Sequence, residues 1–101
     1  MKGSEQGIVR SILEYLSLRK YVCWRNNTGG FVKGDHFYRF GLVGSGDIMG
    51  LTRDGRFFSI EVKKEGKKPT EYQKQFIEDV TKSKGISFVA YSVDDVIHAG
   101  L

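Results

Sequence analysis

The strongest constraint on the fold is the pattern of side chains on either side of Asp54-Gly55, a residue pair common at hairpin turns. In the segment that follows the turn, residues 56–63, side chains alternate between two faces of an extended chain. One face carries Phe58, Ile60 and Val62, and the other carries Phe57, Ser59, Glu61 and Lys63. The stretch 47–63 therefore predicts a β-hairpin whose strands cover 47–52 and 56–63, with one apolar face.

Helices and strands are predicted on both sides of this hairpin. Residues 4–19 read as a helix, because Ser4 is a suitable N-cap and an apolar stripe follows at helical spacing. Residues 21–26 predict a strand. The next segment, 27–40, mixes turn signals with aromatic residues, and predicts either an irregular or a two-stranded excursion.

The C-terminal part predicts a second helix from Thr70 to about residue 83, since Gly85 is a natural stop. Residues 86–91 predict a short apolar strand parallel to a neighbour, and residues 93–98 a last short helix. The expected fold is a small α/β domain covering 1–101, with a mixed sheet flanked by helices in the order αβ(ββ)αβα.

The charge balance favours a polyanionic partner. The 101 residues contain 16 Lys+Arg against 12 Asp+Glu, which gives a net charge of +4 and a pI near 9.3. The single cysteine, Cys23, excludes an intramolecular disulfide and a multi-cysteine zinc site, and we expect it in the core. No apolar run approaches the length of a membrane span, so we expect a cytoplasmic protein, bacterial or in the host cytoplasm for a viral protein.

Two acids and a lysine on the hairpin form the candidate catalytic group. Asp47 begins the first strand, and Glu61 and Lys63 share one face of the second. Carboxylate pairs suit a hard divalent cation, and a nearby lysine can orient water or offset charge on a phosphate. In a basic chain, this combination predicts a nuclease that uses Mg²⁺ or Mn²⁺. The alternative is an exposed hairpin face with scattered charges.

The length of the hairpin loop decides whether these acids meet. A two-residue turn at Asp54-Gly55 pairs Asp47 with Val62, on the wrong face. A three-residue loop, 53–55, with Gly55 in the left-handed conformation and a bulge, pairs Asp47 with Glu61. The nuclease interpretation therefore predicts the longer loop, or a compensating bulge near Gly50.

Two helical residues are candidates to join the group. Glu5 lies at the head of the apolar stripe of the first helix and projects toward the protein, although a carboxylate there also stabilises the helix N-terminus by itself. Gln73 lies within the apolar arc of the second helix, where it would contact Lys63 or the attacking water. Alternatively, Gln73 completes a capping box with Thr70.

Six residues are candidates to contact DNA through charge and hydrogen bonds. A lysine-rich loop follows the hairpin, and a guanidinium and an amide follow Trp24. A solvated loop is the alternative explanation for the lysines. The residues are Arg25, Asn27, Lys64, Lys67, Lys68 and Thr70.

Taken in order, these residues resemble the VRR-NUC family of the PD-(D/E)XK nuclease superfamily. The resemblance covers most of the chain, with one departure, since Gly46 occupies the place of the proline in the superfamily name. The matching positions are Glu5, Trp24-Arg25-Asn26-Asn27-Thr28-Gly29, Gly44-Ser45-Gly46-Asp47-Ile48, Asp54-Gly55-Arg56, Ile60-Glu61-Val62-Lys63, Gly66-Lys67 and Gln73.

The resemblance implies a restriction-endonuclease-like core and a magnesium-dependent hydrolase. Asp47, Glu61 and the Val62 carbonyl would be metal ligands, with Glu5 as a further acidic participant, and Lys63 and Gln73 would support catalysis. Compact viral and bacterial members resemble Holliday-junction resolvases, which implies a homodimer that cuts four-way or other branched DNA. The alternatives are a nonspecific DNA nickase or exonuclease with the same site, and a silent DNA-binding module.

Overall fold

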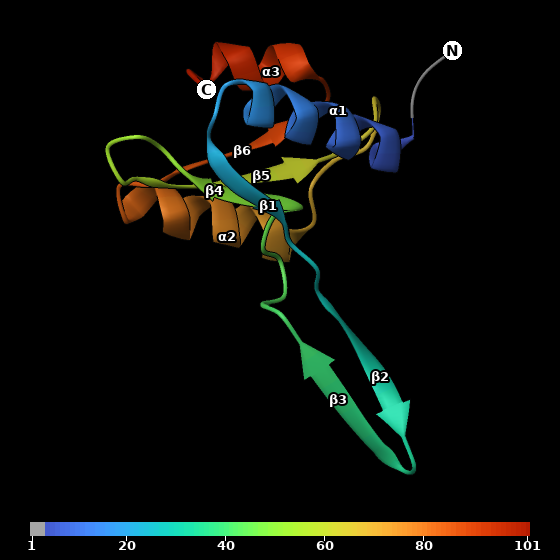
Figure 1. Ribbon diagram of the computed structural model, residues 1–101. Helices are drawn as coiled ribbons and strands as arrows, with labels where there is room; N and C mark the ends of the chain where they lie inside the picture. The colour runs from blue at the N-terminus through green and yellow to red at the C-terminus, as the bar shows by residue number, and fades with distance from the viewer. Residues whose placement is uncertain (1–3) are drawn as a thin grey trace.

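Three helices and six strands make up the computed structural model, which describes residues 4–101 (Figure 1). Four strands form the main sheet, in the order β1-β4-β5-β6, and two form a separate hairpin. The elements are α1 (Glu5–Leu18), β1 (Val22–Arg25), β2 (Gly29–Lys33), β3 (His36–Phe40), β4 (Ile48–Leu51), β5 (Phe57–Val62), α2 (Glu71–Lys82), β6 (Ile86–Ala90) and α3 (Val93–His98).

The β4–β5 hairpin has the longer of the two loops that the sequence allowed. Ile48 pairs with Ile60, and Leu51 pairs with Phe57. The Thr52 amide donates to the Arg56 carbonyl at 2.8 Å, which leaves three residues, 53–55, in the loop. Gly55 has a φ of +87°, the left-handed conformation that such a loop needs. The predicted three-residue loop is confirmed.

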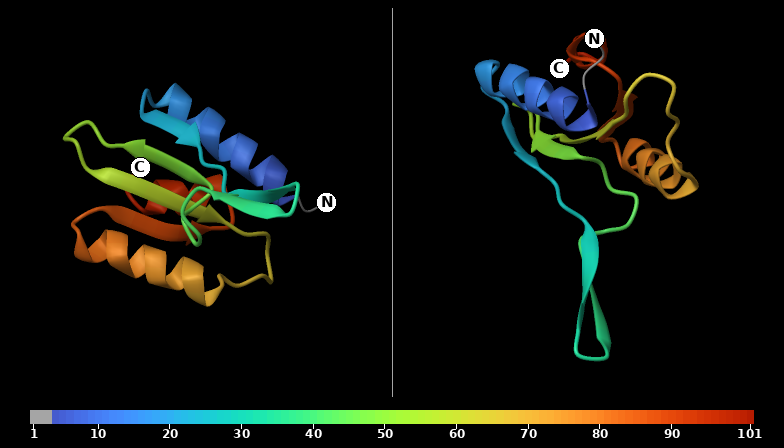
Figure 2. Two further views of the ribbon diagram at one scale, coloured as in Figure 1. Left: turned by 90° about the horizontal axis from the view of Figure 1, so that it is seen from below. Right: turned by 90° about the vertical axis from the view of Figure 1, so that its right-hand side faces the viewer.

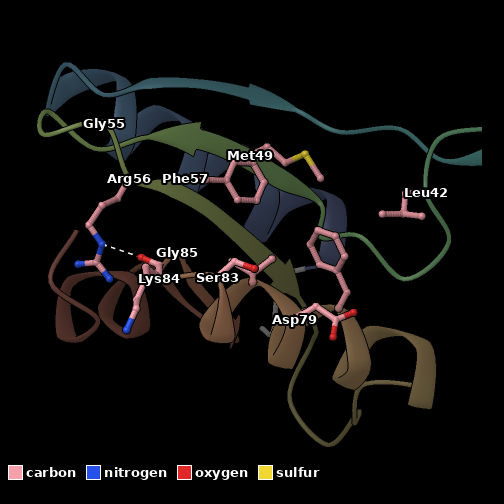
Figure 3. Close-up of a pocket in the computed structure, with 11 residues that line it drawn as sticks. Leu42, Met49, Gly55, Arg56, Phe57, Asp79, Ser83, Lys84 and Gly85 are labelled. Atoms are coloured by element: carbon pink, nitrogen blue, oxygen red, sulfur yellow. Dashed lines mark hydrogen bonds between the residues drawn. The ribbon is translucent and has the colours of Figure 1, made fainter.

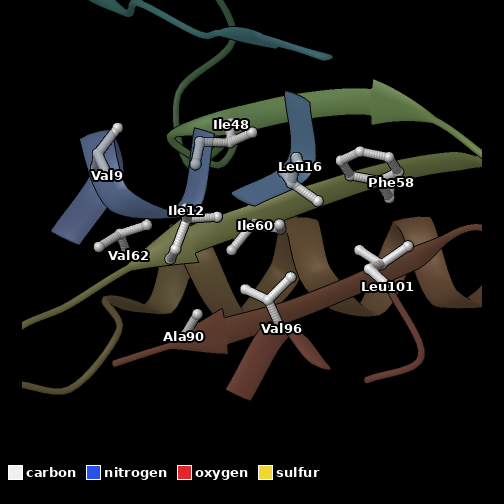
Figure 4. Close-up of a cluster of buried hydrophobic side chains, with 10 residues drawn as sticks. All are labelled: Val9, Ile12, Leu16, Ile48, Phe58, Ile60, Val62, Ala90, Val96 and Leu101. Atoms are coloured by element: carbon white, nitrogen blue, oxygen red, sulfur yellow. The ribbon is translucent and has the colours of Figure 1, made fainter. Parts of the chain in front are cut away.

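One face of the main sheet holds the core. Its apolar side chains on β4, β5 and β6 pack against α1 and α3, which lie together on that side (Figure 4). The helix α1 begins at the predicted Ser4 cap, whose hydroxyl accepts from the Gly7 amide at 3.0 Å. The buried cluster comprises Val9, Ile12, Leu16, Ile48, Phe58, Ile60, Val62, Ala90, Val96 and Leu101. Cys23 packs against this cluster as expected, half-buried.

The opposite face of the sheet is covered only in part. Helix α2 packs on β5 and β6, and Figure 1 shows it on the far side of the sheet from α1 and α3. Strand β6 runs parallel to β5, as predicted, while β4 is antiparallel to both β1 and β5. The mixed sheet flanked by helices is thus confirmed. Ser59 and Glu61 face α2, because they alternate with the core residues of β5.

Residues 27–43 form a two-stranded arm that projects away from the main sheet (Figure 2). Strands β2 and β3 pair with each other from Gly29–Phe40 to Lys33–His36. The predicted excursion is therefore two-stranded, and the element order αβ(ββ)αβα must be corrected by inserting this hairpin after β1. In residues 4–101, no helix is long and apolar enough to cross a membrane.

Candidate active site

Asp47 and Glu61 meet at the end of the sheet where β4 begins and β5 ends. The pairing of Ile48 with Ile60 continues one step outward, since the Asp47 amide donates to the Ile60 carbonyl at 2.8 Å. This places Asp47 beside Glu61, near enough for the Asp47 carboxylate to raise the pKa of Glu61. Asp47 is half-buried, and Glu61 is only 5% exposed. The two acids therefore converge as the longer loop predicted.

The Asp47 carboxylate is held by the main chain of β5. Its Oδ2 accepts a hydrogen bond from the Val62 amide at 2.7 Å. On the other side of Asp47, its carbonyl accepts from the Asn26 amide at 2.8 Å. A carboxylate fixed in this way on neighbouring strands has little freedom to turn away from Glu61.

Glu61 contacts both of the supporting residues that the sequence suggested. Gln73 Nε2 donates to Glu61 Oε1 at 2.8 Å, and Lys63 Nζ lies 3.9 Å from the same oxygen. Gln73 also completes the capping box, because its Oε1 accepts from the Thr70 amide at 2.8 Å. The predicted capping box is therefore confirmed. The same side chain also contacts Glu61, where the sequence analysis expected Lys63 or the attacking water.

Burial makes Glu61 an unusually weak acid. Its removal from water, followed by the nearby Asp47 carboxylate, raises the pKa of Glu61 to about 8, and the Lys63 ammonium only partly offsets this. The negative charge of the Glu5 carboxylate raises the pKa of Glu61 further. Such a cluster has more negative charge than its own lysine neutralises, which favours either a bound proton or a bound cation.

Glu5 reaches the same end of the sheet from the first turn of α1. Its Oε2 accepts from the Lys64 amide at 3.3 Å, just beyond β5. Glu5 is half-buried, in agreement with its predicted orientation toward the protein. It lies at the margin of the Asp47–Glu61 pair, and this hydrogen bond ties its carboxylate to the main chain.

Polar residues that the sequence analysis did not assign shape the segment before Asp47. Asn26 Nδ2 donates to Ser45 Oγ and to the Gly46 carbonyl, both at 2.8 Å. The Gly46 amide donates to Ser59 Oγ at 3.2 Å, and Ser59 is fully buried. The sequence feature that could have identified Ser59 is a small polar residue on the same strand face as Glu61.

Gly46 leaves no room for the proline of the resembled motif. A Cβ at this position would lie 2.4 Å from Ser59 Oγ and 2.8 Å from the Ile60 carbonyl oxygen. Proline would also remove the amide that donates to Ser59. The local backbone at the entry to β4 therefore differs from one that accommodates proline.

We expect Gly46→Pro to lower the free energy of unfolding by about 3 kcal/mol or more, and Gly46→Ala by roughly 1–3 kcal/mol, because both overfill a packed site. Urea unfolding followed by circular dichroism measures the change. The matched control is Gly7→Ala in α1, where the nearest heavy atom is 3.4 Å away. This change should stabilise the protein by about 0.5–1 kcal/mol. Equal stabilities for Gly46→Pro and wild type would contradict the packing described here.

The candidate DNA-binding residues surround the same end of the sheet. Arg25 ends β1 opposite Ile48 and bonds to Gln6 of α1, and Asn27 follows it in the exposed base of the arm. The lysine-rich loop leaves the end of β5, and Lys64, Lys67 and Lys68 are all exposed. Thr70 caps α2 and accepts from the Gln73 amide at 3.2 Å. The chain thus brings its predicted acidic and basic residues to one end of the sheet.

The donor set fits a hard cation but does not form a complete cage. Within the described range, 4–101, no three His, Cys, Asp or Glu side chains gather in a group that could hold a metal ion. Asp47 and Glu61 supply an adjacent pair of carboxylates, and the pKa of Glu61 is raised first by its burial and then by the Asp47 charge, which Lys63 only partly offsets. A divalent cation that keeps several waters needs no more than one or two protein carboxylates.

A separate cleft lies on the α2 side of the sheet, away from the acids (Figure 3). It has a volume of about 740 Å³, and its floor is apolar, with Met49, Phe57 and Phe76 among the lining residues. Leu42, at the base of the arm, borders it on one side.

A scan against models of protein families and a search of curated proteins found no match. The class that the structure defines is therefore a small α/β domain with a mixed sheet flanked by helices. Its distinguishing feature is a pair of acids, the buried Glu61 and the half-buried Asp47, beside a lysine at one end of the sheet.

Proposed function

We propose that this protein is a Mg²⁺- or Mn²⁺-dependent DNA endonuclease with a PD-(D/E)XK core of the VRR-NUC type. The observation that carries the proposal is the strand register that sets Asp47 beside Glu61, with Lys63 3.9 Å from the Glu61 carboxylate. Neighbouring strands supply the two acids, which is the arrangement that the resemblance implies.

Asp47 and Glu61 would hold the metal, with the Val62 carbonyl as a main-chain ligand and Glu5 nearby. When bound, a divalent cation activates water and stabilises charge on the phosphate during phosphodiester hydrolysis. The chain itself orients the ligands, since the Val62 amide fixes Asp47 and the Gln73 amide group fixes Glu61. Hydrogen-bond partners of this kind hold the metal-ligating carboxylates in a productive geometry.

Lys63 supplies a positive charge next to the scissile phosphate. Its side chain is only 15% exposed, so water screens this charge less than that of a surface lysine. In this role it orients the attacking water or offsets developing negative charge. Gln73 supports the reaction by positioning Glu61, because its side chain hydrogen-bonds to Glu61 and to the Thr70 amide.

The exposed lysine loop and the residues after β1 would hold the DNA backbone. The loop that continues directly from Lys63 carries Lys64, Lys67 and Lys68. These lysines would therefore lie near a DNA phosphate bound at the acid pair. From the resemblance to compact VRR-NUC members, we further propose that the protein is a homodimer and that its substrate is branched DNA. A two-fold symmetric protein can present two active sites to a pseudo-symmetric junction.

A panel of DNA substrates tests the proposal. We expect cleavage of four-way junctions and flaps with Mg²⁺ or Mn²⁺ and none with chelator. Equal cleavage of linear duplex would support a nonspecific nickase or exonuclease with the same site. Binding without cleavage on any substrate, in either metal, would favour a silent DNA-binding module and overturn the enzymatic proposal.

A further inference from the structure

The projecting arm carries a row of exposed aromatic rings on one side. Phe31 pairs with Tyr38, and their rings stack with centroids 5.3 Å apart. Phe40 lies on the same side, because the Gly29–Phe40 pair is two steps along the ladder from Phe31–Tyr38. The three side chains are 51%, 45% and 46% exposed. We call Phe31, Tyr38 and Phe40 the ring row.

A two-stranded hairpin is marginally stable in water without a further surface to pack on. In the contacts between elements of residues 4–101, β2 and β3 pack substantially only on each other. Single exposed apolar residues are normal on a protein surface and need no explanation. Three exposed rings in one row form a contiguous apolar patch, which typically marks an interaction site. Within residues 4–101, the ring row therefore lacks cover, and Val32 and Phe37 on the other side of the arm are exposed as well.

The main sheet has an uncovered apolar area on the α2 side. Trp24 pairs with Met49, and Val22 pairs with Leu51, so all four side chains share one face of β1 and β4. This is the face opposite the core, because Cys23 and Ile48 of the same strands pack toward α1. Helix α2 covers β5 and β6 but not β1 and β4. We call Val22, Trp24, Met49 and Leu51 the open face.

The open face adjoins the apolar cleft, which Met49 also lines (Figure 3). In Figure 1, the arm extends on the same side of the sheet as α2, and it points away from the open face of its own chain. A second copy, turned through a two-fold axis, would present an arm to this face while receiving one. A chain that carries both a protruding apolar surface and an apolar surface to receive it meets the requirement of a two-fold interface.

We propose that two copies of this chain associate by exchanging arms, with the ring row of each packed on the open face of the other. At about half exposure, each ring leaves roughly 100 Å² open. Each arm would therefore bury about 300 Å² of its own rings and an equal area of the open face that it covers. The two arms together bury on the order of 1,200 Å², the low end for a specific interface. The inference rests on the homodimer of the proposed function and names its interface, while its test does not depend on the cleavage chemistry.

Sedimentation equilibrium of the full chain, without metal or DNA, tests this proposal. We expect a species of twice the 11.4 kDa chain mass, with association weakened at least about a hundredfold by Phe31→Ser on the ring row or by Trp24→Ser on the open face. Val32→Ser is the matched control, since Val32 lies next to Phe31 on the other side of the arm. It should leave association unchanged, and circular dichroism confirms that each variant is folded.

Mixing the two disrupted chains gives a sharper result. The intact arm of the Trp24→Ser chain can pack on the intact open face of the Phe31→Ser chain, so the mixture should form a heterodimer more readily than either variant forms a homodimer. A wild-type chain that stays monomeric at about 200 µM overturns the proposal. So do disrupted variants that associate as wild type does. Ring-row variants that retain association but lose DNA affinity would assign the arm to nucleic acid.

Discussion

Asp47→Ala is expected to lower Mg²⁺-dependent DNA cleavage by at least about a thousandfold, because it removes one of two carboxylate ligands of the cation. The measurement is single-turnover cleavage of a labelled junction. Lys63→Ala should have a comparable effect through loss of the adjacent positive charge. In both variants, DNA binding measured by fluorescence anisotropy in chelator should stay within a few-fold of wild type, since the exposed lysine loop is intact.

Two further variants separate the charge of Asp47 from its structural role. Asp47→Asn retains an oxygen that can accept from the Val62 amide but loses the charge, so it should remain folded and inactive. Asp54→Ala removes an exposed acid at the opposite end of the same hairpin and should cleave DNA at the wild-type rate. Full cleavage by Asp47→Ala or by Lys63→Ala would remove the nuclease assignment.

Glu61 is expected to make the metal-free protein less stable as the pH rises. Its pKa is raised from an ordinary value of 4.5 to about 8 in the folded state, so folding binds a proton at this group. The stabilisation is fully present below about pH 4.5 and is lost as the pH increases toward 8 and above. The loss amounts to roughly 3–5 kcal/mol, which lowers the melting temperature by more than about 10 °C.

Glu61→Gln isolates this contribution from the other titrating groups. The glutamine keeps an oxygen that accepts from Gln73 but cannot ionise. In chelator, the variant and wild type should have similar stability near pH 5, and the variant should be the more stable at pH 9. Mg²⁺ or Mn²⁺ should raise the melting temperature of wild type, more at pH 8 than at pH 6, and leave that of Glu61→Gln almost unchanged. Parallel pH profiles for the two proteins in chelator would contradict the buried state of Glu61.

Local patterns in the sequence were sufficient for most of the elements. The caps at Ser4 and Thr70 and the alternation in β5 act over a few residues, so their consequences can be predicted without a fold. Gly85 predicted approximately where α2 ends, but the left-handed residue there is Lys84, with a φ of +73°. The three-residue hairpin loop was predicted only conditionally, because Asp54-Gly55 is compatible with both loop lengths. The arm was ambiguous for the same reason, since turn signals and aromatic residues do not specify a pairing partner.

The residue types of the candidate site are determined by the sequence, including the acids, the lysine and the glutamine. Tertiary structure alone decided that Asp47 and Glu61 lie side by side, because this depends on the register between β4 and β5. It also decided the raised pKa of Glu61, since burial beneath α2 and a neighbouring charge are properties of packing. The hydrogen bond between Glu5 and the Lys64 amide joins residues 59 positions apart, and a local sequence pattern cannot predict a contact over that separation.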